Sequence, residues 1–120
     1  MKRQHEMLFG AQPTERGGAR VRLWAPAATD VVLVRSGDGP DQGSFPMGAL
    51  QGGWFELELP RAQARTDYAF RIDDGLVVPD PASRFQPLDV EGPSQILDPL
   101  EFEWTDLGWR GRPWEEAVLY

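Results

Sequence analysis

The stretch VRLWAPAATDVVLV, residues 21–34, decides the fold. Its first half alternates, with Val21 and Leu23 facing one way and the arginines and Trp24 facing the other, which is the two-residue period of a half-buried strand. Pro26 ends this strand because proline has no N–H to donate to a β-ladder. The β-branched run VVLV then predicts a second strand that is covered on both faces.

The same period continues downstream. Trp54–Leu59 alternates apolar and charged side chains, and Thr66–Asp73 places large apolar side chains at every second position. Asp74-Gly75 joins the latter run to Leu76–Val78, which is a strong hairpin signal. Only Pro60–Arg65 is typical of a helical turn. The sequence therefore predicts an all-β fold, an immunoglobulin-like (E-set) antiparallel β-sandwich of six or seven short strands.

The character of the chain changes after Val78. Residues 79–113 contain six prolines, and tryptophans follow at five-residue intervals. We expect a β-sandwich over residues 7–78 and an extended Pro- and Trp-rich tail over residues 79–120. The apolar run Ala117–Tyr120 has no turn or polar cap after it, so we also expect this tail to be a linker into a further domain.

The composition of the chain argues against several classes of function. Nineteen carboxylates against 12 basic residues leave a net charge of −7, which argues against a nucleic-acid binder or a membrane-surface binder. Cysteine is absent and His5 is the one histidine, so neither a thiolate metal site nor a Ser-His-Asp relay is expected. We expect no cofactor and no metal. No apolar run suits a signal peptide or a membrane span, so the cytoplasm is the expected location.

Paired carboxylates are abundant, but none suits catalysis. A glycosidase needs two carboxyl groups across a cleft. Asp73-Asp74 belongs to a predicted turn, Glu56 and Glu58 share the outer face of a strand, and Glu115-Glu116 lies in the tail. The carboxylates of residues 89–106 are spaced too widely for a calcium loop. We therefore assign structural roles to these groups and name no catalytic residue.

Several segments, taken in order, resemble a known family. MLFGA (7–11), VRLWAPAATDVVLV (21–34), GGWFELELP (52–60) and DYAFRIDDG (67–75) resemble the N-terminal β-sandwich of glycoside hydrolase family 13 enzymes, which is related to carbohydrate-binding module family 48. The tail is more specific and is similar to that of the maltooligosyltrehalose trehalohydrolases. Its matching segments are VPDPASRFQP (78–87), VEGPSQILDP (90–99), FEWTD (102–106) and WRGRPWEEAVLY (109–120).

The resemblance implies a non-catalytic module whose partner is the catalytic (β/α)8 barrel of the same polypeptide. The run Val118–Tyr120 is similar to the first strand of that barrel, and the catalytic aspartate and glutamate lie beyond it. Such enzymes hydrolyse the α-1,4 bond next to a terminal trehalose with a retaining mechanism. Two alternatives stay open: a glucan-binding module of a glycogen-debranching or branching enzyme, and a plain immunoglobulin-like domain with a protein partner.

Trp24 and Trp54 are the candidate carbohydrate-binding residues. Each lies on the polar face of its strand, where an exposed indole needs a reason. One interpretation is a platform that stacks against a maltooligosaccharide or another α-glucan. The other, which we favour, is that an adjacent domain, the tail or a second sheet covers both side chains.

Four other residues are candidates for a domain interface. The spacing of Trp104, Trp109 and Trp114 fits neither a strand face nor a helix stripe, so we interpret them as anchors that pin the tail to the sandwich or the barrel. Arg84 is expected to brace the edge of the sandwich by pairing with Asp80, because guanidinium groups bind carboxylates in bidentate geometry.

Overall fold

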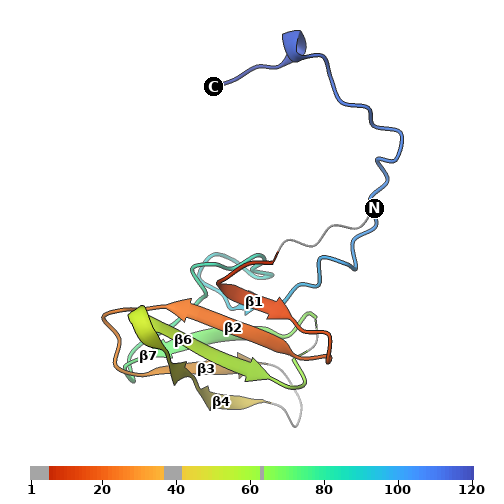
Figure 1. The fold of residues 1–120 in the computed structure, drawn as a ribbon. Coiled ribbons are helices and arrows are strands. Elements are labelled where there is room, and N and C mark those ends of the chain that lie inside the picture. Colours follow the sequence, from red (N-terminus) through yellow and green to blue (C-terminus); the bar gives the residue numbers. More distant parts are fainter. Residues whose placement is uncertain (1–5, 37–41, 63) are drawn as a thin grey trace.

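The structure, a computed structural model, describes residues 6–36, 42–62 and 64–120. His5 and most of the glycine-rich stretch after Ser36 lie outside this part. Two antiparallel sheets pack face to face (Figure 1). The first sheet has the order β1 (Gly10–Pro13), β2 (Ala19–Trp24), β6 (Trp54–Leu59), β5 (Gly48–Ala49). The second has the order β4 (Gly43–Pro46), β3 (Val31–Ser36), β7 (Asp67–Ile72), β8 (Val77–Val78), and β9 (Ser94–Gln95) also pairs with β7.

Helical structure in the described residues is limited to the 3₁₀ turns η1 (Gln51–Gly53) and η2 (Trp114–Glu116). None of it is long and apolar enough to cross a membrane. The prediction of an all-β antiparallel sandwich is confirmed.

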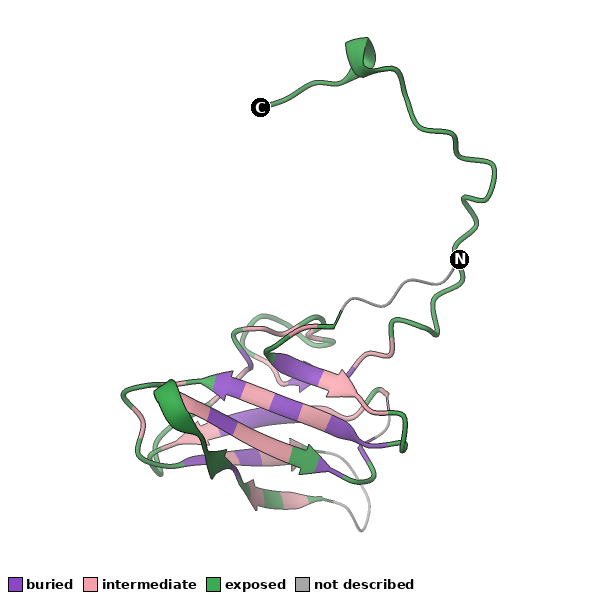
Figure 2. Ribbon diagram, viewed as in Figure 1, coloured by how far each residue is buried: buried purple, intermediate pink, exposed green. Residues whose placement is uncertain are grey.

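The core lies between the two sheets and is built from alternate residues of each strand. Along β2, buried and half-buried residues follow one another as the sequence predicts, and Figure 2 shows this banding. On β6, Phe55 and Leu59 are buried, while Leu57 is half-buried and packs against the core. The largest fully buried side chains are Tyr68, Phe70, Leu33, Ile96, Val21 and Val31. Burying a large aliphatic side chain contributes about 1.5–3 kcal/mol, so this shared interior holds the two sheets together.

The prediction for the VVLV strand is wrong in one respect. Val31 and Leu33 of β3 are buried, but Val32 and Val34 are only half-buried. These two side chains point away from the first sheet, because successive residues of a strand face opposite sides. The continuous apolar run therefore marks a strand with one fully covered face.

The predicted hairpin between β7 and β8 is confirmed, but its turn lies one residue earlier. Asp73 and Asp74 have the positive φ angles, 50° and 55°, and the Gly75 N–H donates to the Ile72 carbonyl over 2.9 Å. Asp73 Oδ1 also accepts the backbone N–H groups of Thr29 and Asp30, at 2.7 and 2.8 Å. This carboxylate therefore ties the hairpin to the start of β3.

The helical turn predicted for Pro60–Arg65 is wrong in the described residues. They form irregular turns, and Arg65 has a φ of 71°. The segment carries the chain from β6 in the first sheet to β7 in the second, and Ala62 is fully buried on the way. The Arg65 N–H donates to the Ile96 carbonyl over 2.7 Å. The need to cross between sheets decides this backbone, and local helix propensity does not.

A buried hydrogen-bond cluster fixes the segment after β8 to the second sheet. The Tyr68 hydroxyl donates to Asp80 Oδ2 over 2.6 Å, the Asp80 N–H donates to Ser94 Oγ over 3.0 Å, and the Ala82 N–H donates to Asp80 Oδ1 over 2.8 Å. Ile96 follows and is fully buried. Packed structure thus continues past Val78 as far as Ile96, while the division of the whole chain into a sandwich over 7–78 and a tail over 79–120 stays a prediction.

Burial changes the pKa values of the two titratable groups in this cluster, Asp80 and Tyr68. It raises the pKa of Asp80, although the hydrogen bonds from Tyr68 and Ala82 and the nearby charge of Arg84 oppose that shift. Burial also raises the pKa of Tyr68, and the Asp80 carboxylate adds to that effect. The hydroxyl therefore stays protonated and acts as the donor.

From Pro99 onward every residue is exposed, and the chain leaves the sandwich as an extended segment (Figure 2). We call residues 99–120 the exposed tail.

Replacing Tyr68 by Phe should lower the free energy of unfolding by about 1–3 kcal/mol, because a buried carboxyl oxygen loses its donor. The loss should grow as the pH rises through the pKa of Asp80 in the folded parent chain. Burial already holds that pKa above its ordinary value, and the hydrogen bond from Tyr68 opposes the shift. Without Tyr68 the folded carboxyl keeps its proton to a still higher pH, so ionisation favours unfolding more strongly than in the parent chain. Urea unfolding at pH 4 and pH 7 measures both effects.

Two controls accompany this variant. In an Asp80→Asn background, Tyr68→Phe should cost the same at both pH values. Ser83→Ala removes an exposed hydroxyl that donates to the Phe85 carbonyl and should change stability by less than about 0.5 kcal/mol. An equal loss for Tyr68→Phe at both pH values in the parent chain would contradict the prediction.

Candidate functional site

Trp24 and Trp54 lie directly opposite each other on the outer face of the first sheet. Trp24 is 59% exposed, and its indole Nε1–H donates to the Gly52 carbonyl over 3.0 Å. Trp54 is half-buried, and the guanidinium carbon of Arg22 lies 5.4 Å from the centroid of its ring system. The structure brings the two predicted residues together but gives them different surroundings. Trp24 is held and accessible, while Trp54 is in cation–π contact with an arginine.

A glycine pair holds the acceptor of Trp24 in place. Gly52 and Gly53 have φ angles of 75° and 83°. A Cβ on Gly53 would lie 2.6 Å from Pro26 Cα, and the Ala25 N–H donates to the Gly53 carbonyl over 2.8 Å. The turn before β6 is thus packed against the end of β2. Sequence reasoning about the site missed both glycines, although their position directly before Trp54 was the available signal.

Next to the tryptophans, the outer face of β2 and β6 carries charged side chains. Arg22 Nε lies 2.9 Å from Glu56 Oε2, and the Arg22 Nη1–H donates to the Leu8 carbonyl over 3.4 Å. One row further along, Arg20 pairs in register with Glu58, and its Nη2 lies 3.8 Å from Glu6 Oε1. Glu56 and Glu58 therefore lie on the outer face as the sequence predicts.

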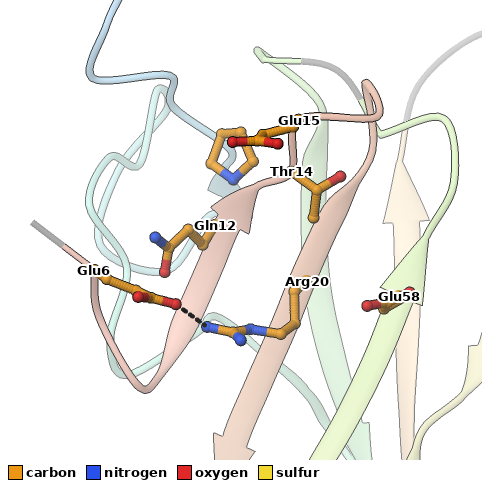
Figure 3. Close-up of a pocket in the computed structure, with 7 residues that line it drawn as sticks. Glu6, Gln12, Thr14, Glu15, Arg20 and Glu58 are labelled. Atoms are coloured by element: carbon orange, nitrogen blue, oxygen red, sulfur yellow. Dashed lines mark ion pairs between the residues drawn. The ribbon is translucent and has the colours of Figure 1, made fainter. Parts of the chain in front are cut away.

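A polar pocket lies at the far end of this face (Figure 3). Its volume is about 430 Å³, and Gln12, Thr14, Glu15 and Arg20 are among the side chains that line it. In Figure 3, Gln12 of β1 and Arg20 of β2 point from neighbouring strands towards the same space. The described residues contain no group of three or more His, Cys, Asp or Glu side chains that could hold a metal ion.

A second cavity, of about 550 Å³, lies where the two sheets end. Leu23 and Trp24 of β2 line it together with Phe70 and Ile72 of β7, and Pro79 follows from the segment after β8. Because most of these side chains belong to the core, this cavity is an opening in the sandwich interior.

The tail tryptophans are exposed. Trp104, Trp109 and Trp114 are 67%, 61% and 75% exposed, and Phe102 meets Trp104 edge to face with ring centroids 4.9 Å apart. The segment that carries them, residues 99–120, leads away from the sandwich (Figure 1). Their role at a domain interface stays a prediction.

Arg84 braces the sandwich, although through a different partner from the one expected. Its guanidinium donates a hydrogen bond to the Ala11 carbonyl of β1. Its charge also acts on Asp80, where it opposes the rise in pKa that burial causes. Arg84 therefore links the segment after β8 to the edge of the first sheet.

Comparisons with known proteins agree with this architecture. The family model described as carbohydrate-binding module 48 (isoamylase N-terminal domain) matches residues 8–83. Malto-oligosyltrehalose trehalohydrolase of Rhizobium sp. (strain M-11) is 35% identical over 112 residues, which cover 92% of this chain and 19% of the relative. The enzyme of the same name from Deinococcus radiodurans is 38% identical over 113 residues, covering 93% and 18%.

A 1,4-alpha-glucan branching enzyme of Xanthomonas oryzae pv. oryzae is 36% identical over 117 residues, covering 92% of this chain and 16% of the relative. Among solved structures, a putative alpha amylase from Salmonella typhimurium is 39% identical with a TM-score of 0.83, over 95% of this chain and 19% of that one. The chain thus spans about a fifth of the length of these relatives.

Replacing Gly53 by Ala should destabilise the protein more than replacing Gly17 by Ala. Both glycines have a φ near 80°, so both variants carry the left-handed strain of about 1–2 kcal/mol. An added methyl group at Gly17 meets nothing within 4 Å, whereas at Gly53 it overlaps Pro26. Urea unfolding measures the difference, and the Gly53 variant should also shift Trp24 fluorescence. Equal losses from the two variants would refute the proposed packing.

Proposed function

Because this chain belongs to the carbohydrate-binding module 48 family, we propose that it is the non-catalytic N-terminal module of a maltooligosyltrehalose trehalohydrolase. In this proposal it packs against the catalytic (β/α)8 barrel of the same polypeptide. One observation carries the assignment: trehalohydrolases of three different organisms are 35–38% identical to this chain over 112–114 residues, well beyond residue 83, where the family model ends. That longer similarity includes most of the exposed tail.

The exposed tail supplies the docking segment. Three indoles, Phe102 and Leu107 are all at least 59% exposed there. Large apolar side chains gain about 1.5–3 kcal/mol each on burial, and aromatic residues dominate the energetics of protein interfaces. An extended segment that presents several of them needs a partner surface, and the catalytic domain is the surface that we propose.

The reaction itself belongs to the rest of the polypeptide. In the proposed whole enzyme, two carboxylates of the barrel hydrolyse the α-1,4 bond next to a terminal trehalose with retention of configuration. We assign no catalytic residue to these 120 residues. The carboxylates described above pair with arginines, cap turns, lie in the exposed tail or, in the case of Asp80, accept hydrogen bonds in the interior.

A module of a branching enzyme is the second candidate, since such an enzyme is also similar along nearly the whole chain. Both candidates share the sandwich and a downstream catalytic domain. They differ in the product of the whole polypeptide, which is free trehalose in the first case and an α-1,6 branch in the second. A plain protein-interaction domain would require neither product.

The 120-residue chain alone should not release trehalose from maltooligosyl trehalose. The assay measures free trehalose after incubation with purified chain, against a control without protein. Release that persists at constant specific activity through repurification would refute the non-catalytic assignment.

Replacing Trp109 or Trp114 by Ala should destabilise the full-length polypeptide by about 3–5 kcal/mol, because each variant removes an indole buried against the barrel. Thermal unfolding and the half-life of trehalose release measure the effect. In the isolated chain the same substitutions should change stability by less than about 0.5 kcal/mol, since both side chains are exposed there. Unchanged stability of the full-length variants would overturn docking through the tail.

A further inference from the structure

We propose that a preformed loop, residues 85–95, docks its exposed apolar side chains against the catalytic domain of the same polypeptide. We call this segment the Gln86 loop, because the Gln86 side chain holds it together. Leu88 and Val90 are buried against an apolar surface of that domain, and basic side chains of the domain pair with the carboxylates between them. The inference rests on the proposed function for the presence of the domain, but the loop is separate from the exposed tail.

A single side-chain amide fills the Gln86 loop. Gln86 Nε2 donates to the carbonyls of Asp89, Val90 and Gly92 over 3.3, 2.8 and 3.2 Å. An amide group has two N–H donors, so one of them is shared between two carbonyls. A Cβ added to Gly92 would lie 3.2 Å from both the Asp89 carbonyl oxygen and Leu88 Cβ, so the turn is closely packed. One buttressing side chain therefore fixes the path of the backbone.

The base of the loop is closed and anchored to the second sheet. The Gln95 N–H donates to the Phe85 carbonyl over 2.8 Å, and Gln95 Nε2 donates to Asp67 Oδ1 of β7 over 2.7 Å. Pro87 and Pro93 fix the φ angle at two further positions. The loop thus has its shape before any partner binds, so docking costs little conformational entropy.

This fixed loop presents apolar side chains to solvent. Leu88 is 78% exposed, Val90 is 74% exposed, and Phe85 at the base is 45% exposed. Single exposed apolar residues are common on protein surfaces, but these three belong to one ordered segment of 11 residues. Loops held on a rigid framework are frequent binding elements. The loop also begins after residue 83, so it lies outside the segment that matches the module family.

The charge of the loop argues against a second copy of the chain as the partner. Asp89 and Glu91 alternate with the two aliphatic residues, and both are exposed. The whole chain carries a net charge of −7, so self-association would bring like charges together, which is unfavourable at an interface. The matching surface is therefore apolar with basic residues at its rim.

The catalytic domain lies within reach of the loop. The chain spans about a fifth of the length of its relatives, so most of each relative lies outside the matched part. Strand β9 forms the base of the loop and is also the last strand before the exposed tail. Gln95 and Pro99 are four positions apart, so their Cα atoms are at most about 14 Å apart. A domain that covers the start of the tail can therefore also contact the loop.

Cysteine labelling tests this docking, because the 120 residues contain no cysteine. Leu88→Cys and Val90→Cys are made in the 120-residue chain and in the full-length polypeptide, and mass spectrometry of the labelled peptide follows the reaction with a maleimide. We expect both thiols to react at least about tenfold more slowly in the full-length polypeptide, since a buried thiol reacts only when the interface opens. Each variant is first checked for an unchanged urea midpoint in the 120-residue chain.

Leu76→Cys is the matched control. Leu76 is 84% exposed on the hairpin between β7 and β8, outside the Gln86 loop, and its thiol should react at the same rate in both forms. Adding Gln86→Ala to the full-length Leu88→Cys variant should restore much of the labelling rate, because the loop then loses the amide that fixes its shape. Gln51→Ala removes an exposed glutamine elsewhere and should not change that rate.

Equal labelling rates for the two loop thiols in both forms would overturn docking through the Gln86 loop. The module assignment would stand if the Trp109 and Trp114 variants of the full-length polypeptide still lost stability, and it would fall with the loop if they did not. Slowing that depends on protein concentration would identify a second copy as the partner and overturn the proposal. An equal slowing of Leu76→Cys would also overturn it, because shielding would then not be specific to the loop.

Discussion

The antiparallel pairing of β2 with β6 is the interaction on which the rest of the structure depends. Its register runs from Ala19 opposite Leu59 to Trp24 opposite Trp54. The same register places one set of side chains in the core and brings the other set together on the outer face. A slip of one residue would exchange the two faces, exposing Val21 and burying arginine. Stability and the candidate site are therefore decided by the same ladder.

The two-residue alternation of the sequence predicted this ladder well. The face on which a strand residue lies follows from its position relative to its neighbours in the sequence. The inward residues of β2 follow the predicted pattern, and both tryptophans lie on the expected face. In β6 and β7 the agreement is less strict, since Leu57 and Ile72 are half-buried against the core and Ala69 is buried on the other face of β7. Local pattern could not predict the contacts that hold them. Trp24 reaches an acceptor 28 residues away, and Asp73 accepts N–H groups from residues more than 40 positions earlier. Such contacts exist only after the sheets have packed.

The Pro-rich segment after β8 also has long-range contacts that local sequence pattern does not predict. Six prolines between residues 79 and 113 favour an extended tail, and residues 99–120 do leave the sandwich. The first part is nevertheless packed around the buried Asp80. Its carboxylate accepts hydrogen bonds from the Tyr68 hydroxyl and the Ala82 N–H, and its own N–H donates to Ser94 Oγ. Burying a carboxyl group disfavours its charged form, and the donors around Asp80 offset that cost. The proline content of this segment indicates that it forms no regular strand. It does not predict the buried hydrogen-bond cluster around Asp80.

Trp24 and the three tryptophans of the exposed tail differ in how firmly the rest of the structure holds them. This difference decides which kind of partner each can bind. Trp24 is fixed by a hydrogen bond on a paired strand, so a ligand that offers little contact area can bind it without ordering the protein. Trp104, Trp109 and Trp114 lie on an extended segment whose backbone has few bonds to the sandwich. Ordering such a segment costs about 1–2 kcal/mol per residue in backbone entropy. Only a partner that buries several of these side chains at once can offset that cost, which a short sugar cannot do and a folded domain can. The rigid indole therefore suits a small ligand, and the tail suits a large one.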